Sequence, residues 1–182
     1  MNTYRDEIQA IFHESLPWDK LSGTKILITG ATGLIGSTLV EVLMSNPHRD
    51  YSVYASGRNL ERARKCFECF SSQESFHFVE YDVVLPLQSD IHFDYIIHAA
   101  SNASPNDFSR NPVEIVKANI YGVSNLIEYG LNHGMKRFLY VSSGEVYGEG
   151  LLLIQVMMGD TLRSYCMRHF GFDGRDTSVI NL

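Results

Sequence analysis

The sequence predicts an α/β fold in which helices cover both faces of a parallel sheet. Short apolar runs alternate along the chain with longer segments of helical periodicity, which is the order of strand–helix–strand units. A glycine-rich segment, 29–36, lies between the first apolar run and the first of these helices. The run 93–98 is largely apolar, as in a strand buried on both faces. Such units join parallel strands by right-handed crossovers, so we expect a doubly wound parallel sheet.

The individual elements follow from periodicity and from residues that begin or end helices. Apolar residues recur at helical spacing over 3–14, and this amphipathic helix ends before Pro17. Asn59 is placed to cap one helix, and Pro112 stands at the first turn of a long helix that Gly134 ends. We expect strands over 25–29, 51–55, 76–81, 93–98 and 137–141, further helices over 34–44, 59–70 and 112–132, and an irregular segment over 163–182.

Glycines 30, 33 and 36 stand between a strand and a helix, the arrangement that binds the pyrophosphate of a dinucleotide. Gly30 permits the tight turn off the strand, Gly33 lets the backbone approach the phosphates, and Gly36 lets the helix pack closely on the sheet. Free N–H groups at the helix start and the positive end of its dipole then face the anion. The candidate contacts are Gly30, Thr32, Gly33, Leu34, Ile35 and Gly36.

The ends of the next strands offer further contacts to such a ligand. No carboxylate follows the second strand to accept from the ribose 2′-hydroxyl of NAD, whereas Arg58 stands there and can pair with the 2′-phosphate of NADP. We therefore favour NADP over NAD, the alternative being that Arg58 is a solvated charge at a helix start. Asp82 after the third strand can accept from the adenine amino group. Val83 follows Asp82, and small residues follow the fourth strand after a packed His98. The candidate contacts therefore also include Val83, Ala99, Ala100 and Ser101.

Composition and charge exclude several classes of function. The 182 residues are 45% hydrophobic and carry a net charge of −6, which favours one globular domain and argues against a general nucleic-acid binder. No signal peptide or membrane-spanning run is visible, and three cysteines suit a reducing cytoplasm. Cys66 and Cys69 have metal-ligand spacing, but no second pair completes a site, so we expect two small apolar helix residues and no metal.

Several motifs fit one family together, and the match covers about residues 23–149. On these residues the chain resembles the extended short-chain dehydrogenase/reductase family, the NAD(P)-dependent epimerases and dehydratases of nucleotide sugars. The resemblance implies a Rossmann-type doubly wound sheet, hydride transfer between the cofactor and a sugar carbon, and a transient keto-sugar. The matching residues are the glycine segment, Asp82-Val83, His98-Ala99-Ala100-Ser101, Asn111-Pro112 with Asn119, and 141–148.

The resemblance also implies roles for particular residues. Ser143 lines up with the family's hydroxyl that hydrogen-bonds the reacting sugar oxygen, and Glu145 with a glutamate that moves a proton. Asn119 matches the helix asparagine near the active site. For each of the three the alternative is a structural or solvent-exposed polar residue. Gly144 replaces the aspartate typical of dehydratases, and segment 103–113 is most similar to the decarboxylase-like and dehydratase-like branches.

The family's catalytic Tyr-x-x-x-Lys is not found after residue 149, and no lysine follows Lys136. Tyr165, with His169 four residues later, is the nearest candidate for the tyrosine. We therefore keep two hypotheses: an epimerase/dehydratase-type oxidoreductase, or a catalytically incomplete dinucleotide-binding fragment of one. The sequence itself leaves the enzyme assignment open.

The expected domain organisation has three parts. Residues 1–22 form a helical extension, 23–150 the dinucleotide-binding domain, and 151–182 a divergent or truncated tail without the family's C-terminal substrate domain. The helix over 112–132 has more apolar positions than one core face needs, and in the family it pairs with another helix between subunits. We expect a homodimer whose substrate is a nucleotide sugar, with neither nucleic acid nor membrane as partner.

Overall fold

The sheet is parallel throughout and has the strand order β3-β2-β1-β4-β5-β6, the order of a dinucleotide-binding doubly wound fold. The computed structural model describes residues 4–101, 112–142 and 177–180. Strand order reverses between β1 and β4, which pair directly, Thr29 opposite His98. The strands are β1 (Lys25–Thr29), β2 (Ser52–Gly57), β3 (Phe76–Glu80), β4 (Tyr95–His98), β5 (Arg137–Val141) and β6 (Thr177–Ile180).

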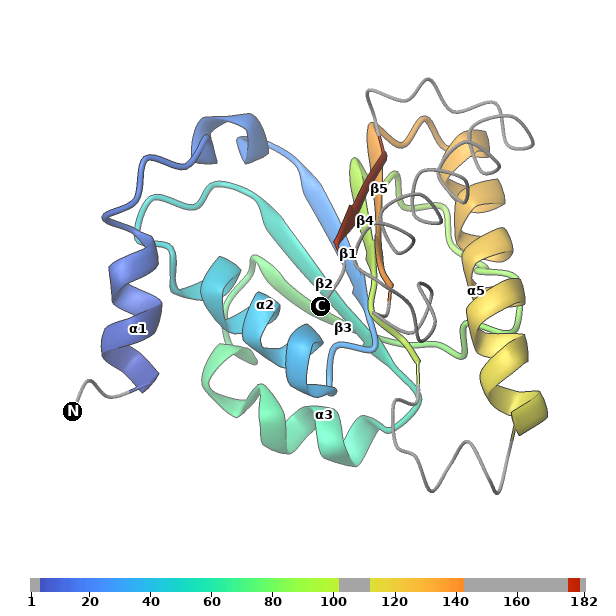
Figure 1. Cartoon of the computed structure of the whole chain (residues 1–182). Coiled ribbons are helices and arrows are strands. Elements are labelled where there is room, and N and C mark those ends of the chain that lie inside the picture. Colours follow the sequence, from blue (N-terminus) through green and yellow to red (C-terminus); the bar gives the residue numbers. More distant parts are fainter. Residues whose placement is uncertain (1–3, 102–111, 143–176, 181–182) are drawn as a thin grey trace, which may run out of the picture.

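Helices lie on both sides of this sheet (Figure 1). α2 and α3 are on one side and α5 is on the other, so the sheet is doubly wound as the sequence predicts. The short α1 packs against α2, where the Tyr4 hydroxyl donates to the Glu41 carboxylate over 2.9 Å. The helices are α1 (Tyr4–Ile11), α2 (Leu34–Ser45), α3 (Leu60–Cys66) and α5 (Pro112–Asn132), with 3₁₀ turns η1 (Trp18–Leu21) and η2 (Glu68–Phe70).

Two apolar cores fill the layers because alternate residues of each strand face opposite sides of the sheet. Ile26 and Ile28 of β1 belong to the core under α2 and α3. Leu27, between them, belongs to the core under α5, together with Ile96 and Leu126. The central strand is therefore buried on both faces, which is why it reads as an unbroken apolar run.

Most predicted elements are confirmed. α1 ends at Ile11 rather than at residue 14, and β2 extends to Gly57 rather than to residue 55. The helix expected over 59–70 divides into α3 and η2, although Asn59 does cap it, its Oδ1 accepting from the Arg62 N–H over 2.8 Å. The strand expected from residue 93 begins at Tyr95. β6 was not predicted: it lies in the segment expected to be irregular and pairs with β5 in parallel. Its four residues are too few for a periodicity signal, and pairing with the open edge of β5 supplies what the local sequence lacks.

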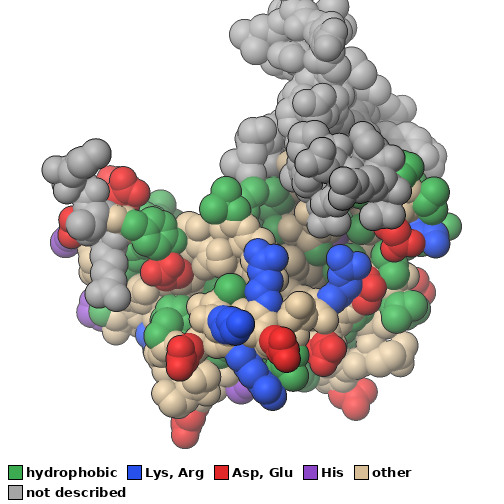
Figure 2. Space-filling model, turned by 90° about the horizontal axis from the view of Figure 1, so that it is seen from below, with side chains coloured by type: hydrophobic (Ala, Val, Ile, Leu, Met, Phe, Trp, Pro, Cys, Tyr) green, Lys and Arg blue, Asp and Glu red, His purple; other side chains and the backbone are tan. Residues whose placement is uncertain are grey.

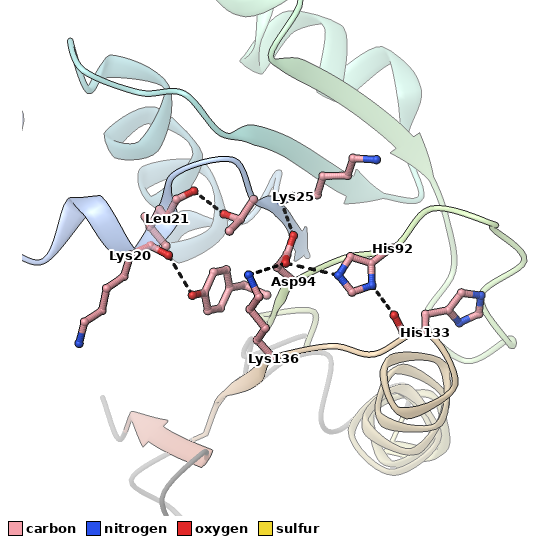
Figure 3. Close-up of polar contacts among 9 residues, drawn as sticks. Lys20, Leu21, Lys25, His92, Asp94, His133 and Lys136 are labelled. Atoms are coloured by element: carbon pink, nitrogen blue, oxygen red, sulfur yellow. Dashed lines mark hydrogen bonds and ion pairs between the residues drawn. The ribbon is translucent and has the colours of Figure 1, made fainter.

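The amino-terminal edge of the sheet is closed by a polar cluster around Asp94 (Figure 3). Its carboxylate accepts from the Lys25 backbone N–H over 2.9 Å and from Lys136 Nζ over 2.9 Å. His92 Nε2 lies 3.3 Å from the same carboxylate, and His92 Nδ1 contacts the His133 carbonyl. Burial opposes the charge, but the bonds from Lys136, Lys25 and His92 hold the pKa of Asp94 below its ordinary value. One carboxylate thus links β1, β4 and the residue before β5.

Candidate functional site

A pocket of about 280 Å³ opens at the other edge, beside the ends of β1 and β4. In open α/β sheets the ligand crevice forms where the strand order reverses, because the loops leaving the two strands diverge there. Figure 2 views this edge, and Lys and Arg side chains gather in the middle of the described surface. The walls come from the turn after β1, the start of α3, the turn after β3, segment 99–101 and the first turns of α5.

The turn after β1 needs glycine at two positions. Gly30 has φ +67°, and a Cβ there would lie 2.5 Å from the Ala99 carbonyl oxygen. A Cβ on Gly36 would overlap the Gly30 carbonyl oxygen. The turn, the α2 helix and segment 99–101 therefore approach one another more closely than any side chain permits. The turn thus forms a cradle: because its glycines have no side chain, a ligand can approach the backbone closely.

The first amides of α2 follow this turn and have no acceptor among the described residues. The Gly33 N–H is used within the turn, where it donates to the Gly30 carbonyl over 2.9 Å. Within the described ranges no side chain caps α2, and its first intrahelical bond runs from the Ser37 N–H to the Gly33 carbonyl over 2.9 Å. The amides of Leu34, Ile35 and Gly36 precede that bond, so they remain for an anion together with the positive end of the helix dipole.

Arg58 and Arg62 form the basic wall at the end of β2. Both line the pocket: Arg58 precedes the N-cap residue Asn59, and Arg62 lies in the first turn of α3. The Arg58 guanidinium lies 3.9 Å from the Asp82 carboxylate, and their side chains are 64% and 35% exposed. An exposed ion pair of this length is weak, so Arg58 is available to a ligand anion. Arg62 was not predicted, because only the helical geometry places it beside Arg58.

The turn after β3 forms the opposite part of this wall. The Asp82 carboxylate accepts from the Val84 N–H over 3.2 Å, and the Leu85 N–H donates to the Asp82 carbonyl over 3.0 Å. From α5, Asn125 Nδ2 donates to the Val83 carbonyl over 3.0 Å. Asp82 and Val83, both predicted cofactor contacts, line the pocket, and their backbone is fixed from two sides.

The floor beneath the pocket holds a buried polar pair. Thr29 Oγ1 and His98 Nδ1 lie 2.7 Å apart, and the His98 ring stacks on Tyr140 at a centroid distance of 5.6 Å. His98 is fully buried; burial lowers its pKa to about 4, and the Ala118 backbone only partly offsets this. His98 is therefore neutral at neutral pH and packed at the strand end, as the sequence predicts.

The pocket brings together most of the predicted ligand contacts. Leu34, Ile35 and Gly36 do not line it; they adjoin it in the first turn of α2, and the Leu34 side chain is 86% exposed. Asn119 lies beside the pocket residue Ala118, and its buried Oδ1 has no partner among the described residues. The predicted residues that line the pocket are Gly30, Thr32, Gly33, Arg58, Asp82, Val83, Ala99, Ala100 and Ser101.

Two groups of residues complete the comparison with the prediction. Ser143, Glu145 and Tyr165 lie outside the described residues. Several lining residues were missed, although a helical face with Ile115 and Ala118 three residues apart was a usable signal for part of them. The missed lining residues are Gly57, Asn59, Arg62, Tyr81, Val84, Glu114, Ile115 and Ala118.

The cysteines and the helices bear on two further expectations. Cys66 and Cys69 are exposed rather than packed against the core. Among residues 4–101, 112–142 and 177–180, no group of three potential metal ligands is found. In those same ranges no helix combines the length and the apolar character needed to cross a bilayer.

Curated relatives include UDP-glucuronic acid decarboxylase 1 of Danio rerio, 34% identical over 149 residues, which are 79% of this chain and 34% of that protein. UDP-glucuronic acid decarboxylase 1 of Xenopus tropicalis is 35% identical over 127 residues, which are 69% of this chain and 28% of that protein. The chain thus spans about a third of the length of these curated relatives.

Solved structures of similar fold cover the chain more fully. The UDP-Glc/GlcNAc 4-epimerase from Campylobacter jejuni has a TM-score of 0.64 and 24% identity, over 87% of this chain and 53% of that one. DesIV, a dTDP-glucose 4,6-dehydratase from Streptomyces venezuelae with NAD and TYD bound, has a TM-score of 0.66 and 19% identity, over 86% and 55%. The family model described as the NAD dependent epimerase/dehydratase family matches residues 26–161, well over half of the chain. The chain therefore belongs to the NAD dependent epimerase/dehydratase family.

Proposed function

We propose that this chain binds a nicotinamide dinucleotide at the carboxyl edge of its sheet and serves an epimerase/dehydratase-type reaction on a nucleotide sugar. The proposal rests on one observation above all: the close approach of Gly30 to Ala99 beside the uncapped start of α2. A diphosphate could approach the backbone of this turn, because its glycines carry no Cβ and the first amides of α2 can donate to an anion. When bound, the cofactor supplies reversible hydride acceptance from a sugar carbon.

The chain's own residues bind and orient the dinucleotide in this proposal. The amides of Leu34 and Ile35 donate to the diphosphate, because no helical acceptor is available to them. Asp82 and Val83 form the adenine wall, and the small residues Ala99 and Ala100 leave room for a flat ligand along the strand ends. Asn119 lies beside the nicotinamide half, where its buried Oδ1, which has no partner among the described residues, supports a ligand contact.

We propose that the cofactor is NADP rather than NAD. Arg58 and Arg62 both line the pocket where NAD-binding folds place an acidic residue for the ribose 2′-hydroxyl. Two guanidinium groups match a 2′-phosphate in charge and in hydrogen-bonding geometry. The nearby carboxylate, Asp82, follows a different strand, β3, rather than β2.

The catalytic roles that we propose come from the sequence motifs. Ser143 hydrogen-bonds the reacting sugar oxygen, and Glu145 transfers a proton next to the transient ketone, where a dry site raises a carboxyl pKa. Tyr165 acts as general acid and base, with His169 as the nearby charge in place of a lysine. Replacement Tyr165→Phe should then abolish turnover in an activity assay and leave dinucleotide affinity unchanged. Full activity of that variant would remove Tyr165 from the mechanism.

The described surface of α5 supports the proposal of a homodimer. Val113, Val116 and Ile120 stand at spacings of three and four residues on one face, with exposures of 62%, 54% and 60%. An apolar helical stripe of this kind favours pairing with the same helix of a second copy. Light scattering on the purified chain measures this directly. We also propose a cytoplasmic location, which the small, odd number of cysteines supports.

A second candidate function is dinucleotide binding without turnover. The sequence observation that favours it is the lack of any lysine after Lys136, since the family's acid–base tyrosine relies on one. A single experiment separates the two candidates: thermal unfolding with NADP or NAD, run beside an assay for conversion of UDP-glucuronic acid and UDP-glucose. Stabilisation with conversion supports the enzyme, and stabilisation without conversion supports the binding protein. No stabilisation by either dinucleotide contradicts both.

A further inference from the structure

Helix α5 touches the adenine wall of the pocket through two residues that the proposed function does not use. At Gly122, a Cβ would lie 3.1 Å from Val83 Cγ2 and 3.1 Å from His98 Nε2. The missing side chain therefore lets the helix lie directly on the turn after β3 and on the end of β4. One helical turn later, Asn125 Nδ2 donates to the Val83 carbonyl over 3.0 Å. The two contacts hold Val83 from outside the pocket that it lines.

Val83 also packs in the apolar core under α5, but the other polar contacts of the turn at 82–84 among the described residues are local or weak. The Val84 N–H donates to the Asp82 carboxylate and the Leu85 N–H to the Asp82 carbonyl, which closes the turn on itself. The Arg58–Asp82 pair is long and exposed, so water screens it. In addition, Arg58 is the residue we assign to the 2′-phosphate, and its engagement there withdraws it from Asp82. The half-buried bond from Asn125 ties the turn to a 21-residue helix instead.

We infer that Asn125 is a positioning residue for the adenosine half of the dinucleotide. By fixing the Val83 carbonyl, it holds Asp82, Val83 and Val84 in the wall arrangement before the ligand arrives, so that binding does not have to order this turn. A preformed wall raises affinity without any contact between Asn125 and the ligand. The inference rests on the proposed function, since it deepens the same site.

Replacement Asn125→Asp tests this with an almost isosteric side chain that lacks the donor and turns a carboxylate toward the Val83 carbonyl. Loss of one such bond corresponds to about a tenfold change in affinity. Calorimetry should show the dissociation constants for NADP, NAD and adenosine 5′-monophosphate rising about tenfold together. Nicotinamide mononucleotide, which does not reach the turn, should bind as it does to the unmodified chain. The matched control is Asn132→Asp, the same change at an exposed position of the same helix.

A second measurement keeps the inference testable if Asn125→Asp folds poorly. In Asn125→Ala, amide hydrogen exchange should rise at 83–85 in the free chain and return to the original rate with saturating NADP. Equal weakening of adenosine and nicotinamide mononucleotides, or unchanged adenosine affinity in a folded variant, would overturn the inference alone. If the unmodified chain binds neither dinucleotide, the proposed function fails, and that result is distinct from the first two.

Discussion

The two edges of the sheet differ in how their polar groups are satisfied. At the amino edge, Asp94 accepts from Lys25, Lys136 and His92, and the chain closes on itself (Figure 3). At the carboxyl edge, the first amides of α2 have no helical acceptor, and Asn119 Oδ1 has no partner among the described residues. The same parallel sheet therefore uses one edge for stability and leaves the other to a ligand.

The largest expected effect is on binding, at the carboxyl edge. In Gly33→Val, the new side chain stands where the diphosphate must approach, and its Cβ lies 3.2 Å from the Gly30 carbonyl oxygen. Dinucleotide affinity should fall at least about 100-fold, whereas the poorer helix cap should lower the free energy of unfolding by only about 1 kcal/mol. Calorimetry and chemical denaturation measure the two quantities. Unimpaired binding would place the diphosphate elsewhere.

The second effect is on stability, and it arises from a residue beneath the carboxyl edge. Folding lowers the pKa of His98 from 6.5 to about 4, so the unfolded chain binds this proton more readily than the folded chain. Neutral His98 contributes about 3 kcal/mol to the free energy of unfolding above pH 6.5, and this contribution is lost as the pH falls toward 4. Denaturation across this range should show that slope.

A control variant isolates the histidine from the other groups that titrate in acid. His98→Asn retains an acceptor for the Thr29 hydroxyl and does not titrate, so its stability profile should be flatter between pH 4 and 6.5. A slope as steep as that of the unmodified chain would assign the acid loss to other residues.

At the amino edge we expect the opposite of the Gly33→Val result: a loss of stability without a loss of affinity. Asp94→Asn keeps the shape of the side chain but removes the charge that pairs with the Lys136 ammonium and accepts from the Lys25 backbone N–H. The free energy of unfolding should fall by about 2 kcal/mol, since hydrogen bonds to charged groups contribute about that much. Dinucleotide affinity should stay unchanged in calorimetry, because the cluster lies at the opposite edge from the pocket. A parallel loss of affinity would mean that the two edges are coupled.

The smallest effect is a change of selectivity at the basic wall. Arg58→Ala should weaken NADP about tenfold and leave NAD almost unchanged, because only the 2′-phosphate distinguishes the two ligands. Arg62→Ala should act in the same direction. Arg64→Ala, a change on the same helix that does not touch the pocket lining, is the matched control. Equal loss of both dinucleotides would assign the arginines to the diphosphate instead.

The sequence predicts the strands of the sheet better than it predicts which residues contact one another at the carboxyl edge. Strands 25–29 and 137–141 have the predicted bounds, because apolar runs between turn residues define them locally. Arg62 and Asn125 were missed because their roles depend on which way a helix faces: the Asn125 partner lies 42 residues earlier in the chain. The N–H of Gly33 closes the turn with the Gly30 carbonyl, a local bond that the sequence pattern does not reveal.

The central claim is that the open amides at the start of α2 hold the diphosphate of a nicotinamide dinucleotide. Amide chemical shifts followed by nuclear magnetic resonance during titration with NADP and NAD test it at the atoms concerned. We expect the largest changes at Leu34, Ile35 and Gly36, with the amide of Lys25 at the opposite edge unmoved. Shifts absent from these three amides at saturating dinucleotide would contradict the account.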